Sequence, residues 1–166
     1  MYAPGKILVV GGGDPPVNRA EVIDLNQAIP SWRAAGTMQY ARRMLNATLL
    51  PDGKVLVTGG TASPTFSDSA GHVDAAELWD PANEKWTTLA SSTGIPRIYH
   101  STALLLSDGR VFSAGGNHQP EVELFSPPYL FKGARPTIAS APSGIVYGQS
   151  FAPEPRMPPR SLKSPC

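Results

Sequence analysis

Three copies of one short pattern occur along this chain of 166 residues, and they limit the possible folds more than any other feature. Each copy contains a turn, a short run rich in β-branched residues and a pair of glycines. The copies are residues 5–12, 52–60 and 108–116. In the second and third copies an apolar run precedes an Asp-Gly pair. A strand, an Asp-Gly turn and a second strand indicate a β-hairpin, because glycine supplies the positive φ that a tight turn requires.

Another matched strand is predicted after each glycine pair, over residues 20–25, 76–81 and 122–127. Trp32 and Trp86 follow the first two of these strands, and each precedes one more short strand. Each repeat therefore predicts four strands in roughly fifty residues, which is typical of a kelch-type propeller blade. We interpret the glycine pairs as points where backbones approach closely near the propeller axis. We interpret both tryptophans as packing between neighbouring blades.

Composition agrees with many short strands. The chain has 16 Gly and 18 Pro, and these residues favour turns over long helices. Its formal net charge of +1 provides no basic surface for nucleic acid or for an anionic membrane. No apolar stretch approaches the roughly 20 residues of a membrane span, and the first residues lack the pattern of a signal peptide. The only cysteine, Cys166, excludes a disulfide within the chain. The localisation of the chain is left open.

Three blades cannot close into a ring, because closed propellers have about 4–8 blades. We therefore expect a fragment or a truncated product of a longer protein, with apolar blade faces exposed at both ends. We assign residues 1–133 to a partial propeller. We assign residues 134–152 to the start of a second β domain, in which 135–138 and 144–148 look like strands. Residues 153–166 are rich in proline and are expected to be disordered.

The segment from residue 96 to residue 111 reads PRIYHSTALLLSDGRV and resembles the copper-site segment of galactose oxidase and the related glyoxal oxidases. The resemblance continues through the glycine pair at 115–116, the run ELFSPPYLF at 123–131 and the run RPTI at 135–138. In that family a seven-bladed kelch-like propeller precedes an immunoglobulin-like β-sandwich. The resemblance covers residues 5–151. It implies an all-β chain of about three propeller blades followed by the truncated start of the sandwich.

Members of this family are copper radical oxidases, which oxidise a primary alcohol or an aldehyde and reduce O₂ to hydrogen peroxide. The resemblance implies that Tyr99 is the axial copper ligand and accepts the substrate proton, and that His100 is one of two equatorial histidine ligands. Imidazole suits Cu(II), and a phenol can accept a proton when a nearby cation favours the phenolate. Successive residues of a strand point to opposite faces, so both side chains reach one ion only if residues 96–98 are an irregular lead-in to the strand.

The remainder of the family's site does not match this sequence. The family's radical cofactor joins a tyrosine to a cysteine, but Cys166 lies in the tail, and residues 41–46 in the second repeat contain no tyrosine. The family's second copper histidine lies in the sandwich, beyond the matched residues. His72 and His118 remain, and we expect both in exposed loops. Two ligands of four, without the cofactor, do not make an oxidase, so it is left undecided whether this chain is an enzyme.

Three interpretations of function follow. In the first, the chain is a fragment of a copper radical oxidase and is inactive alone. Its partners are the missing blades of the same propeller and, in the parent, a carbohydrate or a small aldehyde or alcohol. In the second, it is a non-catalytic kelch-type propeller module that binds a protein or a carbohydrate. In the third, it is a truncated or frameshifted product without a present function. The resemblance implies an extracellular parent.

Overall fold

Strands form almost all of the regular secondary structure, so the predicted all-β class is confirmed. The computed structural model describes residues 1–66, 68–116, 118–135 and 137–156. The chain divides into two compact units, Met1–Pro127 and Pro128–Cys166, and each is described by itself. The predicted divisions after residues 133 and 152 stay predictions. No helix among the described residues is long and apolar enough to span a membrane.

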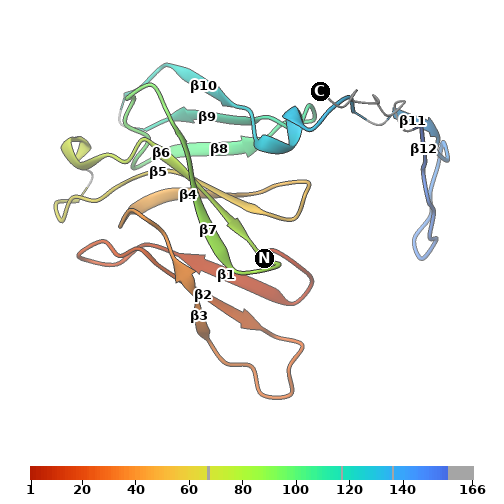
Figure 1. Ribbon diagram of the computed structural model, residues 1–166, viewed down its shortest axis with the longest axis horizontal. Helices are drawn as coiled ribbons and strands as arrows, with labels where there is room; N and C mark the ends of the chain where they lie inside the picture. Colours follow the sequence, from red (N-terminus) through yellow and green to blue (C-terminus); the bar gives the residue numbers. More distant parts are fainter. Residues whose placement is uncertain (67, 117, 136, 157–166) are drawn as a thin grey trace, which may run out of the picture. The chain divides into compact units, whose positions relative to one another are not determined.

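The first unit contains three antiparallel sheets that follow one another in chain order (Figure 1). The first sheet consists of β1 (Lys6–Val10), β2 (Arg19–Asp24) and β3 (Arg33–Thr37). The second sheet consists of β4 (Arg43–Leu49), β5 (Val55–Thr61), β6 (Ala75–Asp80) and β7 (Lys85–Ser91), with the short 3₁₀ helix η1 (Ser69–Gly71) between β5 and β6. The third sheet consists of β8 (Ser101–Leu105), β9 (Val111–Gly115) and β10 (Val122–Phe125).

Among the described residues, only the second repeat has the predicted four strands, because the first and third sheets have three strands each. In the first sheet, the Tyr2 N–H donates to Lys6 O, and in the second sheet the Leu50 N–H donates to Lys54 O in the same way. Tyr2 therefore corresponds to Leu50, which follows β4. Residues 1–3 thus correspond only to the end of a strand such as β4. In the third sheet, Pro127 and η2 (Pro128–Phe131) follow β10. Proline lacks the N–H group that a further ladder would need.

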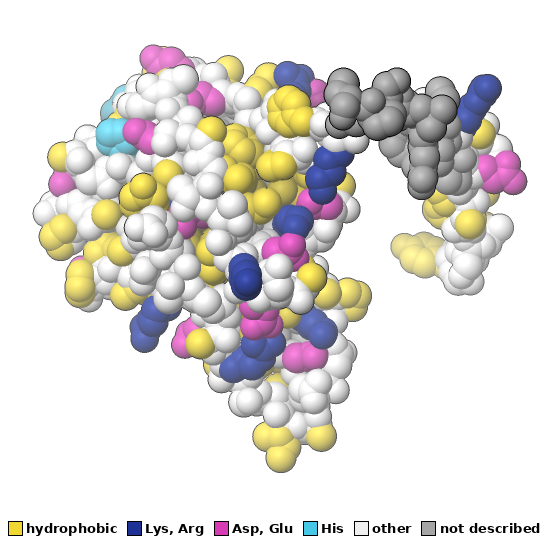
Figure 2. All heavy atoms as spheres, viewed as in Figure 1, with side chains coloured by type: hydrophobic (Ala, Val, Ile, Leu, Met, Phe, Trp, Pro, Cys, Tyr) yellow, Lys and Arg dark blue, Asp and Glu magenta, His cyan; other side chains and the backbone are white. Residues whose placement is uncertain are grey.

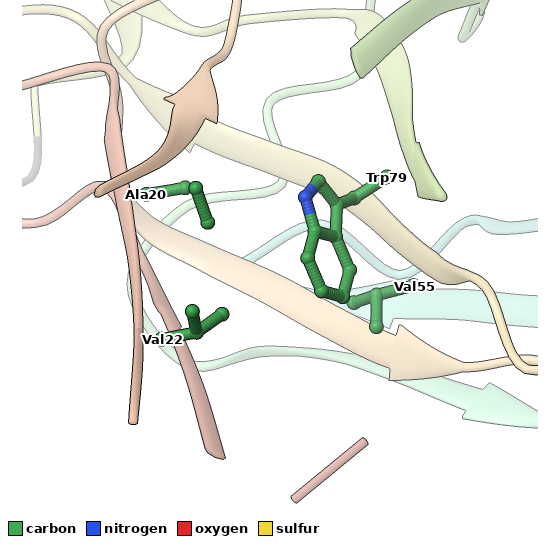
Figure 3. Close-up of a cluster of buried hydrophobic side chains, with 5 residues drawn as sticks. Ala20, Val22, Val55 and Trp79 are labelled. Carbon is green, nitrogen blue, oxygen red and sulfur yellow. The ribbon is translucent and has the colours of Figure 1, made fainter. Parts of the chain in front are cut away.

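The first and second sheets pack through a small buried cluster made of Ala20, Val22, Ala35, Val55 and Trp79 (Figure 3). Figure 3 shows the Trp79 indole lying across from Ala20 and Val22 of β2. The sequence interpretation did not give this role to Trp79, which is fully buried. Burial of one such indole stabilises the fold by about 2–3 kcal/mol.

The two tryptophans that were predicted to pack between blades differ. Trp86, on β7, packs against the buried cluster, and its indole N–H donates to Ala35 O of the first sheet at 3.3 Å. The prediction is therefore confirmed for Trp86. It is wrong for Trp32, which precedes β3 and is 50% exposed.

The glycine pairs mark close backbone approaches, as predicted. A Cβ atom added at Gly59 would lie 2.2 Å from the carbonyl oxygen of Arg97, and one added at Gly11 would lie 2.4 Å from that of Arg42. The next glycine of each pair donates its N–H to the same carbonyl, from Gly60 to Arg97 O at 2.7 Å and from Gly12 to Arg42 O at 2.9 Å. Each of these two glycine pairs thus fixes the segment that leads into the following sheet.

The second unit contains η2 and a two-stranded sheet formed by β11 (Thr137–Ser140) and β12 (Glu154–Arg156). β11 overlaps a predicted strand, whereas residues 144–148 do not form the predicted strand, and the last two of them lie in a turn. β12 falls within the segment predicted to be disordered, and that prediction does not hold at these three residues because they pair with β11. The rest of that segment, residues 157–166, lies outside the described residues.

Candidate functional site

The segment that leads from β7 to β8 carries the predicted copper ligands. Residues 96–98 belong to no strand, residues 99–100 form a turn, and β8 begins at Ser101. The predicted irregular lead-in is therefore confirmed. Ile98 is buried, while Tyr99 is 40% exposed and His100 is also exposed. The segment thus anchors one apolar side chain and presents the next two side chains to solvent.

A left-handed backbone at His100 brings the two exposed rings together. The φ angle of His100 is 63°, a value that is uncommon for residues other than glycine. The Tyr99 and His100 rings stack with their centroids 3.8 Å apart and their planes 28° apart. In a regular strand these neighbours would point to opposite faces. The turn therefore meets the geometric condition for a phenol and an imidazole to approach one ion.

Arg97 holds the lead-in segment against the third sheet. Its guanidinium donates to Gly115 O at 2.9 Å and to Glu121 O at 2.8 Å, and it pairs with the Glu123 carboxylate at 3.3 Å. Thr93 donates to the same carboxylate through its N–H at 2.9 Å and its hydroxyl at 2.8 Å. Burial acts to raise the pKa of Glu123, but the hydrogen bonds of Thr93 and the charge of Arg97 outweigh it, so the pKa lies below its usual value.

The second sheet repeats this arrangement with different residues. Arg42 donates to Gly59 O and Ala75 O, both at 3.0 Å, and to Glu77 at 2.6 Å, while Gln39 N–H donates to Glu77. Both side chains of the ion pair are 0% exposed. Burial lowers the pKa of Arg42, and the Glu77 carboxylate opposes that shift.

We call each of these arginine–glutamate pairs, with its two carbonyl acceptors, an arginine–glutamate clamp. Sequence reasoning missed both clamps. The signal that could have found them is a glutamate at the same place in each matched strand, together with an arginine before the apolar run of the second and third repeats.

The second repeat has a different residue at the position of His100. Strand register pairs Leu45 with Gly59 and Ser101 with Gly115, so the preceding residues Met44 and His100 correspond. Met44 shares the left-handed backbone, with a φ of 57°. The second repeat therefore keeps the left-handed residue, here inside β4, but carries a thioether where the third carries an imidazole.

The Phe66 ring contacts Tyr99, and the Arg43 side chain in turn contacts Phe66. The edge of the Phe66 ring meets the Tyr99 ring at a centroid distance of 5.4 Å, and the Arg43 guanidinium lies 5.7 Å from the centroid of Phe66. Arg43 also pairs with Asp14 at 3.3 Å. The positive charge of Arg43 is therefore held by the Phe66 ring and the Asp14 carboxylate.

The other two histidines have different surroundings. His118 is exposed, as predicted, and it lines the same open cavity of about 530 Å³ as His100, beside the glycine pair at 115–116. His72 is partly buried and not exposed as predicted, because its ring nitrogens lie 2.6 Å from Ser69 O and 3.3 Å from Asp74. Figure 2 shows histidine side chains, in cyan, at one edge of the first unit. Among the described residues, no three His, Cys, Asp or Glu side chains gather closely enough to hold a metal ion.

The repeated sheets and the Tyr-His turn define an all-β protein that resembles the galactose oxidase type. The family model for the glyoxal oxidase N-terminus matches residues 14–129. The chain therefore belongs to the glyoxal oxidase N-terminus family.

Two curated relatives and one solved structure illustrate this relationship. Aldehyde oxidase GLOX1 of Arabidopsis thaliana is 33% identical over 89% of this chain and 30% of its own length. Galactose oxidase of Gibberella zeae is 31% identical over 76% of this chain and 21% of its own. A fungal alcohol oxidase of the AA5 family, solved in complex with copper, has a TM-score of 0.77 and 31% identity over 84% of this chain and 34% of its own. The chain thus spans about a third or less of each.

Proposed function

We propose that this chain is a segment of a copper radical oxidase that oxidises an alcohol or an aldehyde. In this proposal His100 and Tyr99 would both hold copper, and the Tyr99 phenolate oxygen would accept the substrate proton. The observation that carries the proposal is the stacked Tyr99–His100 pair in a left-handed turn, because this backbone turns two consecutive side chains to the same side. The relatives named as aldehyde, galactose and alcohol oxidases support it.

The residues present fit part of a copper site. Imidazole and phenolate are N and O donors of the kind that suit tetragonal Cu(II). Bound copper would supply the one-electron chemistry that links substrate oxidation to the reduction of O₂. The role of Arg97 is to hold the turn in place, since its hydrogen bonds tie the residues just before Tyr99 to β9 and to the residue before β10. We propose that the other ligands and the radical cofactor lie in the missing blades and the sandwich of an extracellular, seven-bladed kelch-type parent, so this chain alone is inactive.

Copper titration tests the ligand assignment. We expect Cu(II) to bind weakly to the full chain, and we expect the His100→Ala variant to lose most of that affinity. His72→Ala is the matched control, because its imidazole is already held by Ser69 and Asp74. Equal affinity in the wild type and His100→Ala would disprove the assignment. With galactose, methylglyoxal or glyoxal and added copper, we expect no peroxide above a copper blank, and peroxide above it would disprove the proposed inactivity.

A second candidate function is a non-catalytic binding module for a carbohydrate or a protein. It is favoured by a cavity of about 360 Å³ between the second and third sheets. Apolar side chains such as Val73, Ile95 and Phe125 line this cavity together with the polar residues Ser92 and Thr93. Pockets that combine an apolar wall with a few polar groups commonly bind small molecules. Sugar binding that persists in His100→Ala and needs no copper would support this candidate over the oxidase segment.

A further inference from the structure

Three glutamates occupy one equivalent place in the three sheets. Glu21 of β2 lies opposite Val9, Glu77 of β6 lies opposite Val57, and Glu123 of β10 lies opposite Ser113. Each opposing residue stands two positions before a glycine pair. The three carboxylates are therefore at the same register of the same fold, and differences between them report on what lies beside each sheet.

The surroundings of Glu21 differ from those of the other two glutamates. Glu77 and Glu123 each receive an arginine and a backbone N–H from the segment that leads into their own sheet. Glu21 is exposed, and within the described part of the chain its side chain makes no hydrogen bond or ion pair. The equivalent carboxylate is bound by an arginine in the second and third sheets and, among the described residues, has no partner in the first. The first sheet therefore contains an incomplete arginine–glutamate clamp.

The strand that would bring the arginine is the one that the first sheet lacks. β5 and β9 pair with β4 and β8, and the segments leading into those two strands carry Arg42 and Arg97. β1, which corresponds to β5 and β9, is the edge strand of its sheet. A long edge strand is a template for pairing with another extended segment.

The acceptors for an arginine are also in place. The Arg42 guanidinium uses Gly59 O and Ala75 O, and Arg97 uses the carbonyls at the corresponding positions, 115 and 121. The matching carbonyls in the first sheet are those of Gly11 and Arg19. Two carbonyls and one carboxylate suit the planar fork of arginine, whereas the compact ammonium of lysine does not span them.

The sheet face beside Glu21 is apolar and open. Ile7, Val9 and Ile23 share that face with Glu21, since alternate residues and their cross-strand partners lie on one side. Val9 is 48% exposed, while its counterpart Val57 in the second sheet is fully buried. The open face thus has the composition of a face that is buried elsewhere in the same molecule.

We propose that β1 and Glu21 form a docking site for an extended polypeptide segment that carries an arginine. The segment pairs with β1 in an antiparallel register, as β4 pairs with β5. Its arginine binds the Glu21 carboxylate and the carbonyls of Gly11 and Arg19. A backbone N–H three or four residues before the arginine completes the site, as Gln39 and Thr93 do for Arg42 and Arg97. This inference does not rest on copper binding.

A peptide with the sequence of residues 39–49 of this chain is the direct probe, because that segment contains a working clamp arginine. We expect the fluorescently labelled peptide to bind the full chain in an anisotropy titration. A peptide with Arg42→Gln should bind about tenfold more weakly, since a hydrogen-bonded charge is lost. The protein variant Glu21→Gln should abolish this difference between peptides, whereas Glu121→Gln, at an exposed glutamate of the third repeat, should preserve it. Equal binding of the two peptides, or no effect of Glu21→Gln, would overturn the proposal.

A fusion keeps the test informative if the free peptide binds too weakly to measure. Residues 39–48 are copied directly before Met1, because the turn hydrogen bonds match Tyr2 with Leu50. We expect this fusion to raise the melting temperature of the chain and its Arg42→Gln version to lose most of that rise. Identical melting temperatures for the two fusions would overturn the proposal. Dimerisation of the unmodified chain that Glu21→Gln abolishes would show that the occupant is a second copy, and this also would overturn it.

Discussion

The segments that lead into the second and third sheets are built alike and end differently. In both, an arginine clamps a glutamate of the following sheet, and a left-handed residue stands just before the residue that pairs with the first glycine of the glycine pair. The left-handed residue and the residue before it are Met44 and Arg43 in the second sheet, where they begin β4, and His100 and Tyr99 in the third sheet, where they lie just before β8. The hydrogen bonds and ion pairs of the two arginine–glutamate clamps do not involve these four residues. Fold and candidate chemistry are therefore carried by separate side chains of one segment, and the chemistry can change while the scaffold stays.

The largest expected effect on stability comes from removing the arginine of an arginine–glutamate clamp. Arg42→Ala would leave Glu77 buried with no cationic partner, which should cost about 3–5 kcal/mol of unfolding free energy. Arg97→Ala should cost less, about 1–3 kcal/mol, because the Glu123 side chain is 17% exposed and keeps its hydrogen bonds from Thr93. Urea unfolding of the full chain measures both values.

Arg110→Ala is the control for this comparison, since its pair with Asp108 is exposed and local in sequence. We expect a change below about 1 kcal/mol there. Equal losses for Arg42→Ala and Arg110→Ala would show that the clamp does not hold the sheet.

A glycine substitution tests how the lead-in segment is attached to the sheet before it. Gly53→Ala places a side chain in open space at a positive φ, which should cost about 1–2 kcal/mol. Gly59→Ala also has a positive φ but would place its Cβ 2.2 Å from Arg97 O, so we expect a further loss of about 1–3 kcal/mol. Urea unfolding of the two variants side by side gives this difference. If Gly59→Ala is no worse than Gly53→Ala, the close approach to Arg97 is not important for stability.

Replacing His100 by methionine, the residue at the corresponding position of the second sheet, should leave the unfolding free energy nearly unchanged. Met44 already occupies the left-handed position that His100 occupies, so His100→Met should change the unfolding free energy by about 0.5 kcal/mol or less. The same variant should lose most of its Cu(II) affinity, as measured by titration. A destabilisation of several kcal/mol would show that His100 has a structural role that Met44 does not share.

The sequence was sufficient to predict local features and insufficient for contacts between sheets. The hairpins, the close approach at Gly59 and the irregular lead-in before Tyr99 depend on neighbouring residues, and turn chemistry identifies them. Trp32 and Trp79 show the limit. Each lies in or beside a strand, yet one is half exposed and the other fully buried. Which tryptophan meets the adjacent sheet depends on how the sheets stack, and a local pattern does not encode that.

The clamps escaped prediction for a related reason. A glutamate that alternates with apolar residues in a strand normally faces solvent. Glu21 follows that rule, while Glu77 has the same local sequence pattern and is fully buried. The difference comes from an arginine 35 residues away along the chain, so the local sequence around each glutamate does not distinguish the two.

The smallest expected effect is a pH dependence of the unfolding free energy that comes from Glu123 in the third sheet. The folded pKa of Glu123 is below its usual value, so its ionised form stabilises the fold fully above the unfolded pKa of about 4.3. That contribution is lost as the pH falls through the folded pKa. The wild type should therefore exceed Glu123→Gln in unfolding free energy at pH 6, and this difference should shrink toward pH 3. Urea unfolding at both pH values measures it. A difference that does not change with pH would mean that the contacts of Glu123 with Thr93 and Arg97 do not depend on its charge.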